Sequence, residues 1–212
     1  MTRGLHVQHR CDSVTPQLPA RGKVLVGLGA NCPGPWGTAQ DTIAQALGEI
    51  ERINIAVTAV SPFYETAAVG SARQPAYVNA VALLDTSLPP EALLRVLKGI
   101  ERKSGRRGGR PWGPRTLDID IVDYGGLVRH WRGGRPAFKE AGTRPLTLPH
   151  PLAHERPFVL KPLLDIAPHW RHPALKQSGR NLWHRVSEHG QGRVLKRLRA
   201  SARQETAGGR RS

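Results

Sequence analysis

The nine residues Thr116-Leu117-Asp118-Ile119-Asp120-Ile121-Val122-Asp123-Tyr124 alternate between polar and apolar side chains. Successive side chains of a β-strand point to opposite faces, so the alternation predicts a strand with its isoleucines in the core. Asp118 and Asp120 then share the other face, where two carboxylates can bind hard divalent cations. If the strand is regular, Asp123 lies on the face opposite this pair. The alternative is a solvated strand face without metal.

The segment before this strand is rich in arginine. It contains Arg106, Arg107, Arg110 and Arg115, and no acidic residue lies between Arg102 and Arg115. A carboxylate pair beside guanidinium groups suits a nucleoside triphosphate, which needs a metal to bridge its phosphates and cations to neutralise them. No GxxxxGK[ST] motif is present, so a P-loop enzyme is excluded. For each single arginine, a solvated surface position is the alternative.

Outward from this strand, strand and helix patterns alternate along the chain. Strands are predicted over 23–28, 53–60 and 77–84, and helices from about Thr38 and from Pro90, which suits a first helical turn. The order βαββαβ predicts an α+β protein of the ferredoxin-like plan, with an antiparallel sheet and both helices packed on one face. Residues 158–166 predict a short element that packs back on the core.

Three regions are predicted along the 212 residues. Residues 1–21 are expected to form a flexible N-terminal extension, and 22–172 a folded domain with an insertion at 126–145. Residues 173–212 are expected to form a basic C-terminal tail. The tail either forms short basic helices that contact RNA, anionic lipid or a partner, or remains solvated without fixed structure. We favour the solvated tail.

The net charge of +16 is distributed unevenly. Residues 102–145 carry 11 basic and four acidic side chains, and residues 175–212 carry ten and two. The first excess surrounds the carboxylate pair and suits a triphosphate site, and the second has no assigned chemistry. An RNA-recognition domain is the alternative that this charge suggests. Such domains need exposed aromatic residues on their central strands, which the predicted strands lack, so only the tail remains a candidate nucleic-acid contact.

The compartment is predicted from what the sequence lacks. It has two cysteines, Cys11 and Cys32, without a CxxC spacing, and no apolar run long enough to span a membrane. It also lacks a charged segment followed by an apolar run at its start. We expect a reduced, cytoplasmic protein that does not bind membranes.

The stretch from Trp112 to Ile121, WGPRTLDIDI, resembles the hallmark of the 6-hydroxymethyl-7,8-dihydropterin pyrophosphokinase (HPPK) family of folate biosynthesis. Other blocks similar to the family follow in order: GLGAN at 27–31, SPFYET at 61–66, QP at 74–75, YVNA at 77–80 and LPHP at 148–151. The resemblance covers about residues 23–172. It implies a monomeric, monofunctional enzyme that transfers the pyrophosphoryl group of ATP to the hydroxymethyl oxygen of the pterin and releases AMP.

The resemblance also implies the site residues. Asp118 and Asp120 would hold two Mg²⁺ ions and, with Arg106 and Arg115, form the catalytic set. The ATP-binding set would be Glu101, Arg107, Trp112, Arg115, Ile121, Thr147, His150 and Arg156. The pterin-binding set would be Thr66, Val69, Tyr77, Asn79, Trp112, Asp118 and Phe158, with Tyr77 and Phe158 stacking on the ring and Asn79 reading its edge.

Several points stay open at this stage. The hydroxyl proton of the pterin would be lost to Asp120 or through polarisation by a metal ion. Glu101 either pairs with the arginines or the nucleotide, or is an exposed carboxylate at a helix end. The family's usual Thr-Pro-Pro is Thr66-Ala67-Ala68 here, which predicts a less rigid loop beside the pterin.

Overall fold

A computed structural model describes residues 22–69, 74–106, 114–133, 145–187 and 192–199. The predicted extension at 1–21 and the site residues Arg107 and Trp112 lie outside the described residues. The elements are β1 (Gly22–Ala30), α1 (Ala39–Arg52), β2 (Ala56–Val60), β3 (Tyr64–Thr66), β4 (Tyr77–Thr86), α2 (Pro90–Lys103), β5 (Asp118–Tyr124), a 3₁₀ turn (Ala153–Glu155), α3 (Pro157–Ile166), α4 (Gly179–Val186) and β6 (Val194–Arg197).

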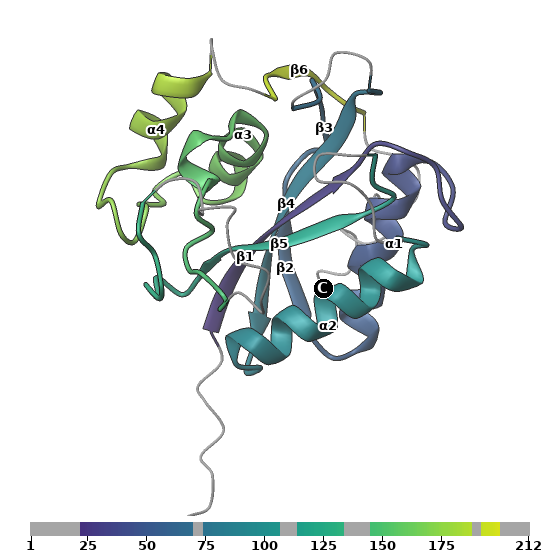
Figure 1. The fold of residues 1–212 in the computed structure, drawn as a ribbon, viewed down its shortest axis with the longest axis horizontal. Coiled ribbons are helices and arrows are strands. Elements are labelled where there is room, and N and C mark those ends of the chain that lie inside the picture. The colour runs from purple at the N-terminus through teal and green to yellow at the C-terminus, as the bar shows by residue number, and fades with distance from the viewer. Residues whose placement is uncertain (1–21, 70–73, 107–113, 134–144, 188–191, 200–212) are drawn as a thin grey trace, which may run out of the picture.

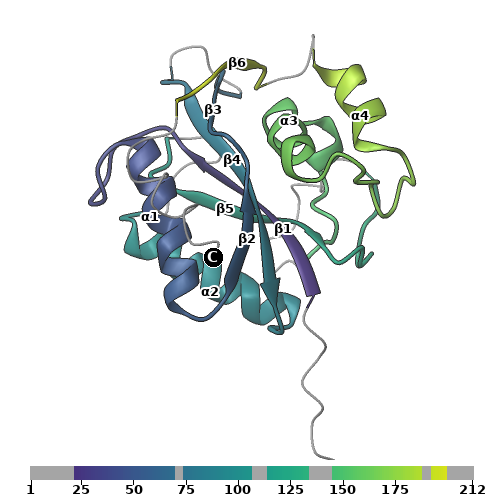
Figure 2. The ribbon, with the colours of Figure 1, turned by 180° about the vertical axis from the view of Figure 1, so that it is seen from behind.

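One sheet lies between two helical layers (Figure 1). Its strands follow the order β5-β1-β4-β3-β6, with β2 also paired to β4, and all pairs are antiparallel. Helices α1 and α2 cover one face, while α3 and α4 lie on the other side, as the view from behind also shows (Figure 2). The predicted α+β class with an antiparallel sheet is therefore confirmed.

The main core lies between the sheet and the helices α1 and α2. Alternate residues of β1, β4 and β5 enter it, which is the period-two pattern that the sequence predicts. Thr38 caps α1, because its hydroxyl accepts a hydrogen bond from the Asp41 N–H at 3.2 Å while the Asp41 carboxylate accepts one from the Thr38 N–H. Pro90 opens α2, as predicted.

The opposite face of the sheet carries a smaller core beneath α3. It comprises Leu25, Val81, Val122, Ala153, Val159 and Leu163. The predicted short element at 158–166 is α3, and it does pack back on the sheet. Only part of this face is covered by these apolar residues. The part toward the start of β5 carries the polar residues described in the next section.

The structure corrects two predictions about the strands. The strand expected from Ile53 begins at Ala56, because 53–55 form the turn after α1, with Asn54 in the left-handed region at φ 61°. A bulge shifts the pairing of β1 and β5 at Leu25, so Asp123 lies on the same face as Asp118 and not opposite it. There the Asp123 carboxylate accepts a hydrogen bond from the Trp170 ring N–H at 2.7 Å.

The prediction of a solvated tail is wrong for two segments. Residues 179–186 form α4, which begins at the capping residue Ser178, packs against α3 and buries Leu182 to 2% exposure. Residues 194–197 form β6, which pairs with β3 at the edge of the sheet. The apolar residues within the basic segment therefore contribute to the fold. No helix within the described ranges is long and apolar enough to cross a membrane.

A buried imidazole lies where the last part of the domain packs on the sheet. His172 is fully buried among the rings of Trp131, His154 and Trp170, with ring centroids 5.3 to 5.7 Å away. Its Nδ1 accepts a hydrogen bond from the Leu175 N–H at 3.1 Å. Burial, with a smaller effect of His154, lowers the pKa of His172 to about 4.

This low pKa predicts acid sensitivity. An unfolded histidine binds a proton below about pH 6.5, whereas His172 in the folded protein stays neutral until about pH 4. Its contribution to stability is therefore complete above pH 6.5 and is lost as the pH falls toward 4, by roughly 3 kcal/mol in all. In His172→Asn, which keeps an acceptor for Leu175, this part of the pH dependence should disappear. Urea unfolding between pH 4 and 7.5 measures it.

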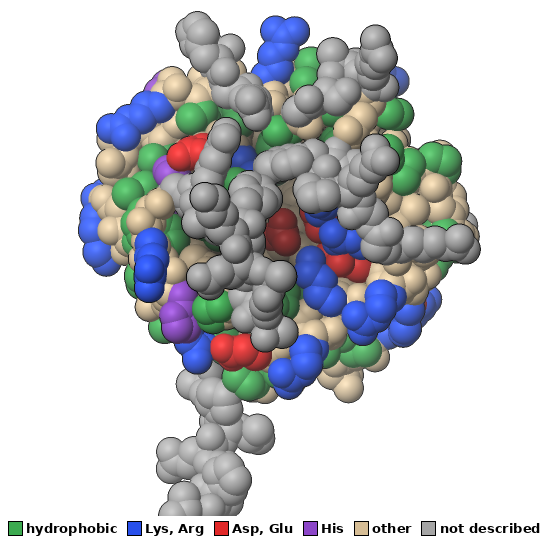
Figure 3. Space-filling view, viewed as in Figure 1, with side chains coloured by type: hydrophobic (Ala, Val, Ile, Leu, Met, Phe, Trp, Pro, Cys, Tyr) green, Lys and Arg blue, Asp and Glu red, His purple; other side chains and the backbone are tan. Residues whose placement is uncertain are grey.

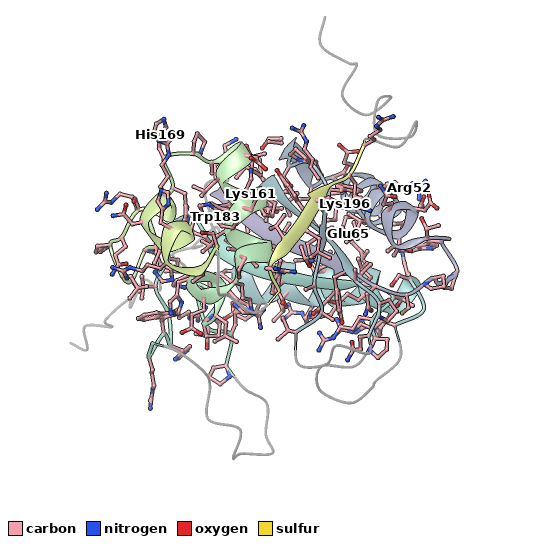
Figure 4. All side chains as sticks on the ribbon, turned by 90° about the horizontal axis from the view of Figure 1, so that it is seen from above. Arg52, Glu65, Lys161, His169, Trp183 and Lys196 are labelled. Atoms are coloured by element: carbon pink, nitrogen blue, oxygen red, sulfur yellow. The ribbon has the colours of Figure 1, made fainter. Side chains whose placement is uncertain are left out.

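The exposed His169, which points away from the molecule in Figure 4, provides the control. His169→Asn should keep the pH dependence of the unaltered chain. An unchanged pH dependence in His172→Asn would show that protonation of His172 does not destabilise the fold.

Candidate active site

The site lies on the sheet face opposite α1 and α2, across strand β1. Gly27 of β1 pairs with Asp120 of β5, and Gly29 is placed between Asp118 of β5 and Asn79 of β4. The two glycines leave the floor between the carboxylates and Asn79 free of side chains. At Gly29 this is a requirement, because a Cβ there would lie 2.7 Å from the Asn79 Oδ1.

Acidic and basic side chains gather near the middle of this face, where the surface is hollowed (Figure 3). Arg106 donates to Asp118 Oδ1 at 2.5 Å, and Arg115 donates to the other oxygen of the same carboxylate. Burial opposes the charge of Arg106, but the carboxylates of Asp118 and Glu101 raise its pKa. Charge-assisted hydrogen bonds thus hold both arginines at the predicted metal ligand.

Glu101 of α2 is the buried support of this cluster. It is 3% exposed, so the alternative of an exposed helix-end carboxylate is wrong. Its Oε1 accepts hydrogen bonds from the Ile119 N–H and from Lys98, both at 2.6 Å, and its Oε2 lies 2.5 Å from Arg106. Burial raises the pKa of Glu101, and Lys98 opposes this effect. Because both oxygens already have partners, Glu101 orients the cations and the edge strand.

Asp120 differs from Asp118 in having no close donor among the described residues. Its nearest basic groups are Lys98 Nζ at 3.7 Å and His150 Nε2 at 3.8 Å. Burial would raise the pKa of Asp120, but the neighbouring basic groups, which include the permanent charges of Lys98 and Arg156, lower it. The Asp120 carboxylate is therefore ionised and has oxygens available for a ligand.

His150 comes from the loop that follows the insertion. The main-chain N–H of His150 donates a hydrogen bond to the Val122 carbonyl at 2.9 Å, which fixes the loop to β5. Its Nδ1 accepts from the Leu152 N–H at 3.0 Å, so in the neutral ring the proton is on Nε2, the nitrogen nearest Asp120. Burial lowers the pKa of His150 to about 4 although Asp120 opposes the shift, so the ring is a neutral donor at pH 7.

The predicted pterin residues lie on the other side of β1. Asn79 is 6% exposed and donates from Nδ2 to the Thr66 hydroxyl at 2.7 Å. Tyr77 lies on the same face two residues before, and burial raises its pKa. Phe158 projects from α3, with the guanidinium of Arg156 5.4 Å from the centre of its ring. This contact places a predicted ATP residue next to a predicted pterin residue.

Two further residues of the predicted ATP-binding set, Ile121 and Thr147, lie within the described part of the chain. The side chain of Ile121 is 3% exposed in the main core, which leaves only its main-chain atoms for a ligand. Thr147 is partly exposed, two residues before Pro149 and three before His150.

The sequence interpretation missed Asn31 and Lys98 as site residues. Asn31 is 5% exposed, accepts a hydrogen bond from the Arg115 N–H at 2.8 Å and donates to the Pro75 carbonyl at 3.3 Å. It therefore connects the arginine loop to the loop before Tyr77. The GLGAN block contained Asn31, and the spacing of Lys98 and Glu101 on a helix was the available signal for the lysine.

Comparison with known proteins gives consistent matches. A model of the 7,8-dihydro-6-hydroxymethylpterin-pyrophosphokinase (HPPK) family matches residues 25–168. A 2-amino-4-hydroxy-6-hydroxymethyldihydropteridine pyrophosphokinase of Synechocystis sp. is 39% identical over 150 residues, which are 70% of this chain and 68% of that protein. The Pseudomonas aeruginosa protein of the same name is 40% identical over 152 residues, 71% of this chain and 84% of that protein.

The fold is similar to that of larger solved proteins. An HPPK-DHPS variant of Plasmodium falciparum, solved with pterin and p-hydroxybenzoate, matches with a TM-score of 0.62 and 15% sequence identity. The match covers 82% of this chain and 45% of that one, so this chain spans less than half the length of the solved protein. At this identity the likeness concerns the fold alone.

The buried position of Glu101 generates a stability prediction. Glu101→Gln keeps an acceptor for the Ile119 N–H but removes the charge that balances Lys98 and Arg106. Loss of one partner of a buried ion pair costs about 3–5 kcal/mol, because it leaves uncompensated charge. We expect a loss at the lower end of this range in urea unfolding, since Lys98 is partly exposed.

Glu91→Gln on the same helix is the matched control. Glu91 forms an exposed ion pair with Arg129, so its loss should change the free energy of unfolding by less than about 1 kcal/mol. Equal effects of the two substitutions would contradict the supporting role of Glu101.

Proposed function

The chain belongs to the HPPK family, and we propose that the sheet face carrying Asp118, Asp120 and Asn79 is its active site. The protein is a pyrophosphokinase of folate biosynthesis, which transfers pyrophosphate from ATP to the hydroxymethyl group of 6-hydroxymethyl-7,8-dihydropterin and releases AMP. One observation supports the site most strongly. The two carboxylates and the buried amide of Asn79 lie on either side of β1, whose Gly27 and Gly29 have no side chains on that face.

We assign the sheet to the ferredoxin-like plan. The order β5-β1-β4 with β2 beyond β4, together with α1 and α2 on one face, supports this assignment when β2 and β3 are counted as one interrupted strand. The plan puts the first and last strands of the βαββαβ unit side by side. In this chain that brings the glycines of β1 against the aspartates of β5.

We propose that the cations around Asp118 form the phosphate side of the site. Arg106 and Arg115 have planar forks of donors that suit phosphate oxygens, and Arg156 lies on the same side. His150 adds a neutral donor from Nε2. Arg107 and Trp112 remain expected ATP contacts outside the described residues, and Thr147 and the main chain of Ile121 remain expected ones within them.

Mg²⁺ fits the carboxylates of the site. Within the described ranges, no group of three or more His, Cys, Asp or Glu residues could hold a metal ion. Mg²⁺ does not need such a group, because one or two carboxylates, water and substrate phosphates satisfy it. We propose that Asp118 and Asp120 hold two Mg²⁺ ions together with ATP. The ions would neutralise phosphate charge during the transfer.

The chain's own residues then position the reactants. In the transfer, the hydroxymethyl oxygen of the pterin loses its proton, to Asp120 or to water, and forms a bond to the β-phosphorus of ATP. The bond from that phosphorus to the bridging oxygen breaks, and this oxygen leaves with AMP. Holding both substrates across β1 makes this step effectively intramolecular. Arg106, Arg115 and Arg156 stabilise the negative charge on the transferred group.

The pterin is proposed to lie on the β4 side of β1. Tyr77 and Phe158 supply aromatic faces, and Asn79 and Thr66 supply hydrogen-bonding groups for the ring edge. Val69 contributes an apolar contact, and Asp118 is the proposed point where the pterin and metal sites meet. Asn79 already has one fixed partner in Thr66, so its carbonyl oxygen is held in one orientation.

We further propose that the enzyme acts as a cytoplasmic monomer and that 22–172 contain its whole catalytic site. The proposed site residues all lie within 22–172. Cys32 is a free thiol, in keeping with a reduced compartment.

The carboxylate proposal is tested with Asp120→Asn. Since Asp120 receives no hydrogen bond from the described residues, the substitution should leave the free energy of unfolding within about 1 kcal/mol of its normal value. AMP formation from ATP in the presence of the pterin should fall by about 10² to 10³-fold. Removing Mg²⁺ with EDTA should abolish it in the unaltered enzyme.

Asp85→Asn, which alters a carboxylate at the other end of β4, should retain full activity. Full activity of Asp120→Asn would refute the assigned site. A well-folded enzyme that never forms AMP with the pterin would refute the function itself.

The pterin side is tested with Asn79→Ala. The variant loses a buried hydrogen-bonding amide, so pterin affinity should fall at least about tenfold, while ATP affinity should stay within twofold. Separate titrations of the two substrates measure this difference. Asn181→Ala, an exposed position on α4, should leave both affinities unchanged, and an equal loss for ATP and pterin in Asn79→Ala would contradict its assigned role.

A further inference from the structure

The C-terminal segment 192–198 lies outside the residues matched by the family model and runs beside the proposed pterin site. Its strand β6 pairs with β3, with Lys196 opposite Glu65 and Val194 opposite Thr66. Lys196 and Glu65 also form an ion pair at 3.2 Å, and Figure 4 shows the two side chains together at β6.

This segment holds both ends of β3. The Leu198 N–H donates to the Phe63 carbonyl at 2.8 Å, and the Ala67 N–H donates to the Arg193 carbonyl at 3.0 Å. The second bond exists because residue 67 is alanine, since proline has no N–H to donate. Leu198 also packs against the main core, which anchors the end of the segment.

The strand that it holds carries part of the pterin site. Thr66 accepts the hydrogen bond from Asn79, and Val69 follows in the loop after β3. The other end of β3 is fixed to α3, because the Tyr64 hydroxyl donates to Asp165 at 2.7 Å. Besides its pairing with β4, β3 is therefore held by contacts with both α3 and β6, and these contacts position the Thr66 side of the pterin site.

Gly192 is the point at which the segment touches the proposed pterin pocket. A Cβ built at Gly192 would lie 2.4 Å from Cδ1 of Phe158 and 3.1 Å from Cγ2 of Val69. The backbone of Gly192 has a φ of +78°, a conformation that side chains disfavour. The contact thus requires glycine for two reasons, and its backbone supports the Phe158 ring from the side of Val69.

We propose that the C-terminal segment 192–198 is a positioning element of the pterin site, with Gly192 as its critical residue. It packs between the Phe158 ring and Val69. It thereby fixes the position of the Phe158 ring relative to Tyr77, the other aromatic face of the slot that receives the flat pterin. The inference rests on the proposed function, because it assigns the pterin to this slot. Gly192 acts through Phe158 and Val69, so it is a positioning residue.

The test compares Gly192→Ala with Gly126→Ala in the full-length chain. Gly126 has a φ of +79° and no atom within 4 Å of a built Cβ, so its alanine variant imposes the same backbone strain without a contact. We expect Gly192→Ala to raise the KM and Kd for the pterin by about tenfold to a hundredfold, since displacements near 1 Å have effects of this size. The Kd for ATP should change less than twofold, and Gly126→Ala should match the unaltered enzyme in both.

A double-mutant cycle with Phe158→Leu identifies the route of the effect. If Gly192→Ala acts by displacing the ring, its effect on pterin affinity should shrink to less than threefold when Phe158 is already leucine. Equal pterin affinities for Gly192→Ala and Gly126→Ala would overturn the inference, as would a full additive effect in the Phe158→Leu background. If the unaltered enzyme itself failed to bind the pterin, the proposed function would fail instead.

Discussion

The buried carboxylate of Glu101 is the interaction on which the rest of the site depends. It accepts the main-chain N–H of Ile119, the residue between the two aspartates, and it pairs with Arg106. One group on α2 therefore fixes both the edge strand and a cation that faces it. Edge strands present unpaired N–H groups, and here one such group is used to orient the carboxylates. Burying the Glu101 carboxylate is costly unless both of its oxygens have partners, and Lys98, Arg106 and the Ile119 N–H provide them.

The glycines of β1 provide the second constraint. Strand pairing sets the distance between β5 and β4, and a side chain at Gly29 would collide with Asn79. The same strand contributes Val24, Val26 and Leu28 to the main core from its other face. Because glycine alternates with large apolar residues in β1, one face of the strand packs in the main core and the other face leaves space for ligands. In the proposed site the two substrates would meet across that face, because the sheet separates the groups assigned to bind them.

Much of this arrangement could be predicted from the sequence, because it depends on local rules. Alternation in 116–124 predicts the shared face of Asp118 and Asp120, and the register in the structure agrees. The burial of Glu101 could not be predicted, since it depends on how α2 packs against the edge of the sheet. The bulge that turns Asp123 toward Trp170 and the pairing of β6 with β3 are also products of contacts distant in the chain. For the last segment, the basic composition favoured a solvated tail over the alternative of short helices, and the contacts that its few apolar residues make could not be predicted.

Part of the charge of the central segment is balanced within the fold. Arg106 and Arg115 are both paired with Asp118, so they do not face solvent as a bare cationic patch. Binding of a triphosphate with its metal ions would exchange partners: the arginines would turn to phosphate, and the carboxylate would turn to the cation. Such an exchange leaves each charge paired before and after binding, which lowers the desolvation cost of bringing ATP into a hollow lined by charged groups.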